Sequence, residues 1–328
     1  MNKISFVVPV FRNAGSLKGT HDAIAALFAD ALSDYELEMI FVDDGSDDSS
    51  YEELSAISAG DPRVRLIKFT RNFGQFPAMI AGYKQASGDA IVNISADMQD
   101  PVELVVDMVS QWKGGAEIAV GYRIEREDAI PATLFSRLAY GTLRLTNKQI
   151  PAGGFDYVLM SRRALETFLQ YRGRNRFFQG DVLWAGYRTA FLPYVRRRRE
   201  VGKSQYTFGK KLKLFFDFVI DASYLPIRLI SWVGFTTATA GAIYASMIAF
   251  SWLLGRSPFV GWSPIMIALL LIGGIIMLML GIIGEYLWRI LDEVRGKPLY
   301  IVDRSSATFD SLGSSQAPEL RATRPSEL

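Results

Sequence analysis

Two long runs without a charged side chain constrain the fold of this chain more than any other feature of its sequence. Residues 229–254 and residues 257–284 contain no Asp, Glu, Lys or Arg. A helix rises about 1.5 Å per residue, so about 20 apolar residues cross the hydrocarbon core of a bilayer. Helices in soluble cores rarely stay uncharged over this length. We therefore expect two transmembrane helices, at about residues 229–254 and 264–287.

The basic residues around these runs predict how the chain is oriented. Arginines and lysines gather before the first run and after the second, whereas the short connection, residues 255–263, holds a single charge at Arg256. Cytoplasmic flanks of membrane helices carry the excess of Lys and Arg. We therefore expect a multi-pass protein of the cytoplasmic (inner) membrane, with the large N-terminal domain and both termini in the cytoplasm.

Residues 1–200 alternate between short β-rich runs and longer helical patterns. Strands are expected at residues 4–9, 37–42, 64–69, 90–94 and 118–122, and helices at residues 14–32, 51–58, 76–86 and 102–113. This alternation is typical of βαβ units, which build a mostly parallel sheet with helices on both faces. The expected fold class is α/β.

Composition excludes several kinds of function. The 328 residues carry 36 Lys and Arg against 34 Asp and Glu, and a net charge of +2 argues for no nucleic-acid partner. The chain has no cysteine, which excludes disulfides and thiolate metal sites. Its one histidine, His21, is expected to be a surface or packing residue. Neither a G-x-G-x-x-G fingerprint nor a P-loop is present, which argues against dinucleotide oxidoreductases and P-loop NTPases.

Polar residues follow four of the expected strands. Arg12 comes after the first strand, Asp43 and Asp44 after the second, Arg71 after the third and Asp97 after the fourth. In open α/β sheets, ligands bind outside the carboxyl ends of the strands. We therefore expect the ligand chemistry to gather along that edge of the sheet.

Asp97 is the candidate metal ligand at this edge. Mg²⁺ takes oxygen ligands, keeps several waters and uses one or two carboxylates together with substrate phosphates. One carboxylate and a nucleotide diphosphate meet that need, with Gln99 adding an amide oxygen or positioning a metal-bound water. Asp43 and Asp44 would accept hydrogen bonds from ribose hydroxyls or from a base N–H. The alternative is that these acids cap helices and form turns, as such residues usually do.

Four motifs resemble those of the family 2 glycosyltransferases. They are Val-Pro-Val-Phe at residues 8–11, Phe-Val-Asp-Asp-Gly-Ser at 41–46, Arg-Asn-Phe-Gly-Gln at 71–75 and Ala-Asp-Met-Gln-Asp-Pro at 96–101. From about residue 3 to residue 303, the chain is similar to the polyprenyl-phosphate branch, which includes dolichol-phosphate mannose synthase and bacterial undecaprenyl-phosphate glucosyl- and aminoarabinosyltransferases. The resemblance implies a GT-A (Rossmann-like) fold and inverting transfer of a sugar to a polyprenyl (undecaprenyl) phosphate.

The resemblance also implies roles for individual residues. The donor would be a nucleotide sugar, a UDP-sugar in preference to a GDP-sugar. The implied donor-binding residues are Pro9, Phe11, Asp43, Asp44, Arg71, Ser95, Asp97 and Arg123. The implied cofactor is Mg²⁺ or Mn²⁺, held by Asp97 and Gln99, and the implied catalytic residues are Asp97 and Asp156. The implied acceptor-phosphate ligands are Arg199, Lys203 and Ser204.

Two of these roles have alternatives. A phosphate monoester has a second pKa near ~6 and is largely dianionic at neutral pH. Such an acceptor needs less help from a base than a sugar hydroxyl would. Asp156 would therefore orient the acceptor or tune its protonation, and obligatory proton abstraction by Asp156 is the alternative. The arginines at residues 196–199 also fit a solvated basic flank that orients the spans or attracts anionic headgroups.

The chain departs from the family pattern at three positions. Asn13 stands where many relatives have a Glu near the nucleoside, and Gln205 stands where a Lys is usual. Ser95 replaces the first acid of the Asp-x-Asp motif, so metal ligation rests more heavily on Asp97. Lys203 is the alternative source of the charge missing at residue 205.

The expected organisation has four parts. Residues 1–206 form a cytoplasmic GT-A domain, residues 207–227 an interfacial amphipathic helix, residues 228–288 the two spans, and residues 289–328 a cytoplasmic arm with a disordered tail. A soluble core helix fits residues 207–225 nearly as well on periodicity alone. Residues 297–302 form a β-like run that would dock back on the first domain.

Two rival functions remain to be weighed against this one. A processive polysaccharide synthase would have more spans and a Gln-x-x-Arg-Trp motif, and the sequence has neither. A catalytically silent, nucleotide-sugar-binding membrane scaffold would not need Asp97, Asp156 and Arg199 together. Small residues in both spans and an extended arm are compatible with a homo-oligomer.

Overall fold

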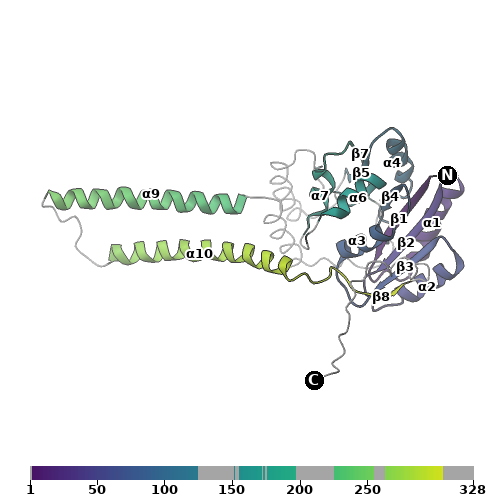
Figure 1. Ribbon diagram of the computed structural model, residues 1–328, viewed down its shortest axis with the longest axis horizontal. Coiled ribbons are helices and arrows are strands. Elements are labelled where there is room, and N and C mark those ends of the chain that lie inside the picture. Colours follow the sequence, from purple (N-terminus) through teal and green to yellow (C-terminus); the bar gives the residue numbers. More distant parts are fainter. Residues whose placement is uncertain are drawn as a thin grey trace, which may run out of the picture.

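We describe the chain from a computed structural model. The structure describes residues 2–124, 151, 155–171, 173, 176–196, 225–254 and 263–305. An α/β domain carries two long helices, α9 (Leu225–Leu253) and α10 (Ser263–Val294), which run side by side away from it (Figure 1).

The described part of the α/β domain is built on one eight-stranded sheet. Its strands are β1 (Lys3–Val10), β2 (Glu36–Asp43), β3 (Val64–Phe69), β4 (Ala90–Asn93), β5 (Ile118–Arg123), β6 (Tyr157–Ser161), β7 (Thr189–Tyr194) and β8 (Val302–Ser305). Their order is β7-β5-β6-β4-β1-β2-β3-β8. The pairs of β1 with β2 and β4, of β2 with β3 and of β5 with β7 are parallel, whereas β6 and β8 are antiparallel to their neighbours. The α/β class and the mostly parallel sheet are confirmed.

Helices cover both faces of this sheet. They are α1 (Leu17–Ala29), α2 (Ser50–Gly60), α3 (Gln75–Gln85), α4 (Leu104–Lys113), α6 (Arg162–Gln170) and α7 (Phe178–Trp184). Side chains alternate between faces along a strand. Phe6 and Val8 of β1 therefore join the core under α1, α2 and α4, while Val7 joins the core under α3, α6 and α7.

The expected strands and helices are present with shifted ends. The helix expected from residue 102 begins at Leu104, because Pro101 opens a turn in which the Leu104 N–H donates to the Pro101 carbonyl at 3.2 Å. Four further elements, β6, α6, α7 and β7, are not among the expected ones. The antiparallel β6 lies between β4 and β5, so the sheet is mixed at that point.

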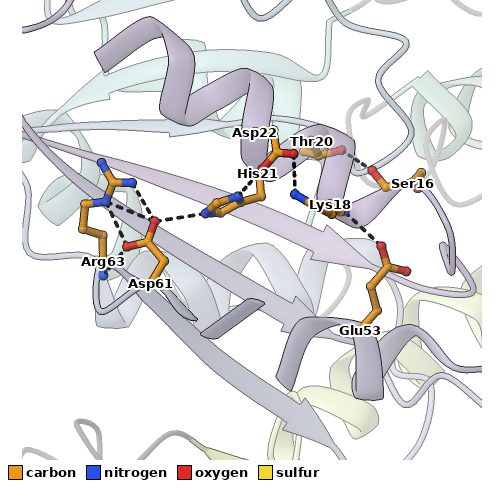
Figure 2. A network of polar contacts seen from close by, with 8 residues as sticks. All are labelled: Ser16, Lys18, Thr20, His21, Asp22, Glu53, Asp61 and Arg63. Atoms are coloured by element: carbon orange, nitrogen blue, oxygen red, sulfur yellow. Dashed lines mark hydrogen bonds and ion pairs between the residues drawn. The ribbon is translucent and has the colours of Figure 1, made fainter. Parts of the chain in front are cut away.

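A polar network ties α1 to its neighbours (Figure 2). His21 bridges two carboxylates, with Nδ1 at 2.9 Å from Asp22 and Nε2 at 3.0 Å from Asp61. Arg63 also pairs with Asp61, and its guanidinium holds the pKa of that carboxyl well below its usual range. His21 is thus a packing residue with polar partners, in agreement with the sequence expectation.

The C-terminal arm returns from α10 to the edge of the sheet. Tyr300 stacks on Phe69 of β3, with ring centroids 4.9 Å apart, and the Thr70 N–H donates to the Ile301 carbonyl at 3.1 Å. The next residues form β8, which pairs with β3. The expected docking is confirmed, but the strand lies at Val302–Ser305 and not at residues 297–302.

The helices α9 and α10 match the two uncharged runs in position. Within the described residues, one segment, Leu271–Val294 of α10, is long and apolar enough to cross a membrane, and none of its most apolar window is buried. Of the two expected transmembrane helices, α10 is therefore supported as a candidate. That α9 also crosses the membrane stays a prediction. The expected interfacial helix lies mostly outside the described residues.

Candidate functional site

The candidate site lies where the carboxyl ends of the central strands meet. Strand pairing puts Asp43 opposite Val10 and puts Asn93 opposite both Val7 and Val158. Because β6 is antiparallel, its first residues lie at the same edge, so Asp156 just before it joins this group. The sheet thus gathers candidate residues from four strand ends.

Asp43 is fully buried at the end of β2. Its Oδ1 accepts a hydrogen bond from the Ser46 N–H at 3.1 Å, whereas Oδ2 has no partner among the described residues. Burial raises the pKa of this carboxyl above its ordinary value. One oxygen therefore shapes the turn, and the other is an acceptor that these residues leave unsatisfied.

Asp44 holds the loop that follows β3. Its carboxylate accepts from the Phe73 N–H at 2.6 Å and from the Gly74 N–H at 2.8 Å. A Cβ at Gly45, where φ is 66°, would lie 2.4 Å from the Arg71 carbonyl carbon, so only glycine permits this approach. Both oxygens of Asp44 are thus used by the chain, and direct contact of Asp44 with a donor stays a prediction.

The other residues expected on the donor side lie around these two acids. Pro9 is half-buried in β1 opposite Val42, and the Phe11 N–H donates to the Asn13 side chain at 3.0 Å. The exposed Arg71 guanidinium lies over the Phe73 ring, 4.0 Å from its centroid. These contacts order the rim of the site but assign no ligand to it.

The turn after β4 presents Asp97. Its Oδ1 lies 2.9 Å from the Ser95 hydroxyl and accepts from the Gln99 N–H at 3.3 Å. Met98 adopts a left-handed conformation, with φ of 56°. Ser16, just before α1, and Thr20 of α1 both donate to the Ala96 carbonyl. Both side chains are labelled in Figure 2. The Asp97 carboxylate is therefore buried in a turn that α1 holds in place.

Asp156 and Arg123 form an ion pair beside this turn. Arg123 Nη2 lies 3.2 Å from Asp156 Oδ2, and Arg123 Nε donates to the Tyr194 hydroxyl at 3.3 Å. Burial lowers the pKa of Arg123, but the nearby Asp156 and Tyr194 raise it by more, so it stays above its ordinary value. Asn93 donates to the Asp156 carbonyl and accepts from Tyr83 at 2.9 Å. The structure thus brings together two residues that the sequence placed 33 positions apart.

Sequence reasoning missed Asn93 and Tyr194, and it gave Asp100, which is part of the 96–101 motif, no role of its own. Tyr194 donates to Asp100 Oδ1 at 2.7 Å, and burial followed by the charge of Asp100 raises the pKa of Tyr194 above its ordinary value. Asp100 lies in the same turn as Asp97, so its position in the 96–101 motif could have marked it as a residue of the site. Tyr194 ends an unpredicted strand, and no local pattern marks it.

The donor set fits a divalent cation that a substrate completes. Within the described residues, no group of three or more His, Cys, Asp or Glu side chains could hold a metal ion. Asp97 supplies one buried carboxylate, and an Mg²⁺ ion needs only one or two together with phosphate oxygens and waters. The residues therefore fit such an ion only when a phosphate-bearing ligand is present.

Three expected residues, Arg199, Lys203 and Ser204, lie outside the described residues, so the structure does not test their role. The described part of the site covers the residues expected to bind the donor, the Asp97 turn and the Arg123–Asp156 pair.

Residues 5–169 match the family described as Glycosyl transferase family 2. The chain is 37% identical over 306 residues to the uncharacterized glycosyltransferase YkcC of Bacillus subtilis (strain 168), covering 92% of this chain and 93% of that protein. It is 32% identical to a bactoprenol glucosyl transferase of Shigella phage SfII, covering 92% and 98%. A crystal structure of glucosyl-3-phosphoglycerate synthase from Mycobacterium tuberculosis with Mn²⁺, UDP-glucose and phosphoglyceric acid has a TM-score of 0.46 and 20% identity, covering 67% of this chain and 78% of that one.

The pKa of Asp44 makes a prediction for stability. Burial raises this pKa from 3.8 to about 6, so the folded chain holds the proton more tightly than the unfolded chain. The resulting contribution to stability is fully present below pH 3.8 and is lost as the pH rises through about 6. We expect the free energy of unfolding, taken relative to Asp44→Asn, to fall by roughly 3 kcal/mol over this range. Denaturant unfolding of the detergent-solubilised chain measures it.

Asp47→Asn provides the control of opposite sign. The Arg12 guanidinium holds the pKa of Asp47 below its ordinary value, so its contribution is present at neutral pH and is lost as the pH falls. An Asp44→Asn difference that stays constant from pH 4 to pH 7 would contradict the raised pKa.

Proposed function

Because the chain belongs to glycosyltransferase family 2, we propose that it transfers a sugar from a nucleotide sugar to a polyprenyl phosphate at a membrane. The observation that carries the proposal is the similarity to bactoprenol glucosyl transferases, which extends over 92% of this chain and therefore includes α9 and α10. A lipid acceptor explains why a sugar-transfer domain is joined to long apolar helices.

The proposed donor lies at the carboxyl edge of the sheet. The unpartnered Oδ2 of Asp43 is an acceptor for a base N–H or a ribose hydroxyl. Arg71 follows β3 and Arg123 ends β5, so the strand order places them on opposite sides of β4 and its Asp97 turn, where a diphosphate would bind. A UDP-sugar is proposed in preference to a GDP-sugar, and Pro9, Phe11, Asp44 and Ser95 are proposed as the other residues that line the donor.

Asp97 and Gln99 are the proposed ligands of Mg²⁺ or Mn²⁺. When bound, the cation would neutralise charge on the leaving diphosphate. Asp97 is suited to this because its carboxylate is buried and its turn is fixed by Ser95 and by α1. A prearranged carboxylate needs no reorganisation during the reaction.

The proposed reaction is a single displacement. A phosphate oxygen of the acceptor forms a bond to the anomeric carbon while the bond from that carbon to the diphosphate oxygen breaks, which inverts the configuration. Asp156 is proposed to orient the acceptor, since its ion pair with Arg123 fixes its direction. Arg199, Lys203 and Ser204 are proposed to bind the acceptor phosphate, where an arginine offers a bidentate fork.

A transfer assay tests this function. Membranes containing the chain are incubated with undecaprenyl phosphate and a panel of UDP- and GDP-sugars, and products are identified by mass. We expect transfer from a UDP-sugar, its loss on adding EDTA and its return with Mg²⁺ or Mn²⁺. Asp97→Asn should lower the rate by about a hundredfold, the size typical for losing one group that stabilises charge in the transition state.

Asp107→Asn, an exposed acid on α4, is the matched control and should leave the rate unchanged. Transfer that persists in EDTA would remove the metal role of Asp97. No transfer from any donor would favour the silent scaffold instead. Near-normal turnover of Asp156→Asn across neutral pH would exclude proton abstraction by Asp156.

Asp43→Asn tests the donor site separately from transfer. The amide oxygen is expected to stay on the Ser46 N–H, which leaves an NH₂ group where the unpartnered oxygen was. That group cannot accept a hydrogen bond, so we expect UDP affinity to fall by about tenfold, as for the loss of one hydrogen bond to a charged group. Titration calorimetry with UDP measures it, and affinity equal to that of Asp107→Asn would contradict the assignment.

The proposed organisation in the membrane follows the sequence expectation. We propose spans at about residues 229–254 and 264–287, with residues 1–206, an interfacial helix at residues 207–227 and the arm at residues 289–328 on the cytoplasmic side. The exposure of the apolar side chains of α10 supports this proposal, since a soluble core helix would bury them.

Cysteine labelling tests this topology, because the chain has no native cysteine. In spheroplasts, an impermeant maleimide should label Ser257→Cys in the connection between the helices. Ser110→Cys on α4 should react only after the membrane is broken. Protection of Ser257→Cys together with labelling of Ser110→Cys would reverse the orientation, and equal labelling of both in spheroplasts would contradict two spans.

A further inference from the structure

A continuous chain of hydrogen bonds crosses the carboxyl edge of the sheet. It runs from the Arg123–Asp156 pair through Tyr194, Asp100 and Ser95 to Asp97. The function proposed above gives no task to Asp100 or Tyr194. Both are nevertheless buried polar groups in the middle of this chain.

The direction of these hydrogen bonds is fixed by their chemistry. Arg123 has no acceptor, so its Nε–H donates to the Tyr194 oxygen. The tyrosine hydroxyl must then donate its own proton to Asp100 Oδ1 at 2.7 Å. The second oxygen of Asp100 lies 2.7 Å from the Ser95 hydroxyl, which also lies 2.9 Å from Asp97. Since a serine hydroxyl has one proton, Asp97 and Asp100 share a single donor.

The fold holds the middle of this chain rigidly. Strand pairing places Arg123 beside Tyr194, because β5 and β7 are parallel neighbours. The Tyr194 ring packs edge-on against Tyr157, with centroids 6.0 Å apart, and the Tyr157 hydroxyl donates to the Pro101 carbonyl at 3.1 Å. The turn that carries Asp100 is therefore fastened to the sheet at two adjacent points.

We infer that Asp100 and Tyr194 are positioning residues that set the placement of the Arg123–Asp156 ion pair relative to Asp97. This inference rests on the function proposed above. A displacement reaction needs its nucleophile and leaving group held in line, and small misplacements lower the rate steeply. The Tyr194–Asp100 hydrogen bond links Asp156, which is proposed to orient the acceptor, to Asp97, which is proposed to hold the metal on the leaving diphosphate.

Tyr194→Phe removes the hydroxyl and keeps the ring, so it tests this link with little risk to folding. With undecaprenyl phosphate and the UDP-sugar found in the assay, we expect kcat to fall about tenfold while KM for the donor stays within twofold. Asp100→Ala should act similarly, because it removes both acceptor oxygens, whereas the NH₂ group of an asparagine would still donate to the Ser95 oxygen and keep the chain joined. The double variant should be as slow as the slower single variant, since both changes cut the same chain.

Tyr187→Phe is the matched control. It also removes one tyrosine hydroxyl contact, to Thr167 at 2.7 Å, and it precedes the opposite end of β7. Its kcat should equal that of the unsubstituted chain, and melting temperatures of all variants are measured alongside. An unchanged kcat in Tyr194→Phe, an equal loss in Tyr187→Phe, or a double variant slowed by the product of both effects would overturn the inference. No transfer by the unsubstituted chain would instead overturn the proposed function, and the inference with it.

Discussion

Four buried carboxylates at one edge of the sheet depend on hydrogen bonds supplied by the chain itself. An ionised carboxylate costs several kcal/mol to bury unless donors replace the lost water. Here backbone N–H groups and hydroxyls supply them, and each donor fixes a loop. The Ser46 turn, the loop at residues 71–74 and the turn at residues 95–101 have their shapes because Asp43, Asp44, Asp97 and Asp100 need partners. The edge that the sequence marks as a ligand site is therefore also a self-supporting polar structure.

The sequence left two interpretations open for these acids, and the structure divides them residue by residue. Asp44 acts as a loop former with both oxygens, whereas Asp43 uses one oxygen for its turn and leaves the other without a partner in the described chain. The two neighbouring acids thus differ: Asp44 builds the rim with both oxygens, and Asp43 is the one proposed to contact the donor. Because their contacts differ in this way, no single role describes both Asp43 and Asp44.

Local patterns in the sequence were sufficient for the first five strands and the helices between them, because apolar periodicity records which face is buried. They were insufficient for β6 and β7, whose places in the sheet depend on pairing with strands that lie far away in the sequence. The contact between Asp100 and Tyr194 spans 94 positions and depends on the pairing of β5 with β7. No spacing rule reaches such a contact. The motifs therefore predicted which strand ends meet at this edge, but not how they are connected to Asp156.

The C-terminal arm gives the loop at residues 71–74, the proposed donor-side loop, a second support from the direction of α10. Tyr300 stacks on Phe69, and Phe69 packs edge-on against Phe73, with centroids 5.8 Å apart. The Phe73 N–H is one of the two groups that Asp44 accepts from. The loop is therefore held by a buried carboxylate on one side and by an aromatic stack on the other. If α10 lies in the membrane as proposed, this aromatic stack fixes the distance between the bilayer and the proposed donor-side loop. Transfer to a lipid acceptor needs such a fixed distance, because the acceptor phosphate cannot leave the membrane surface to find the donor.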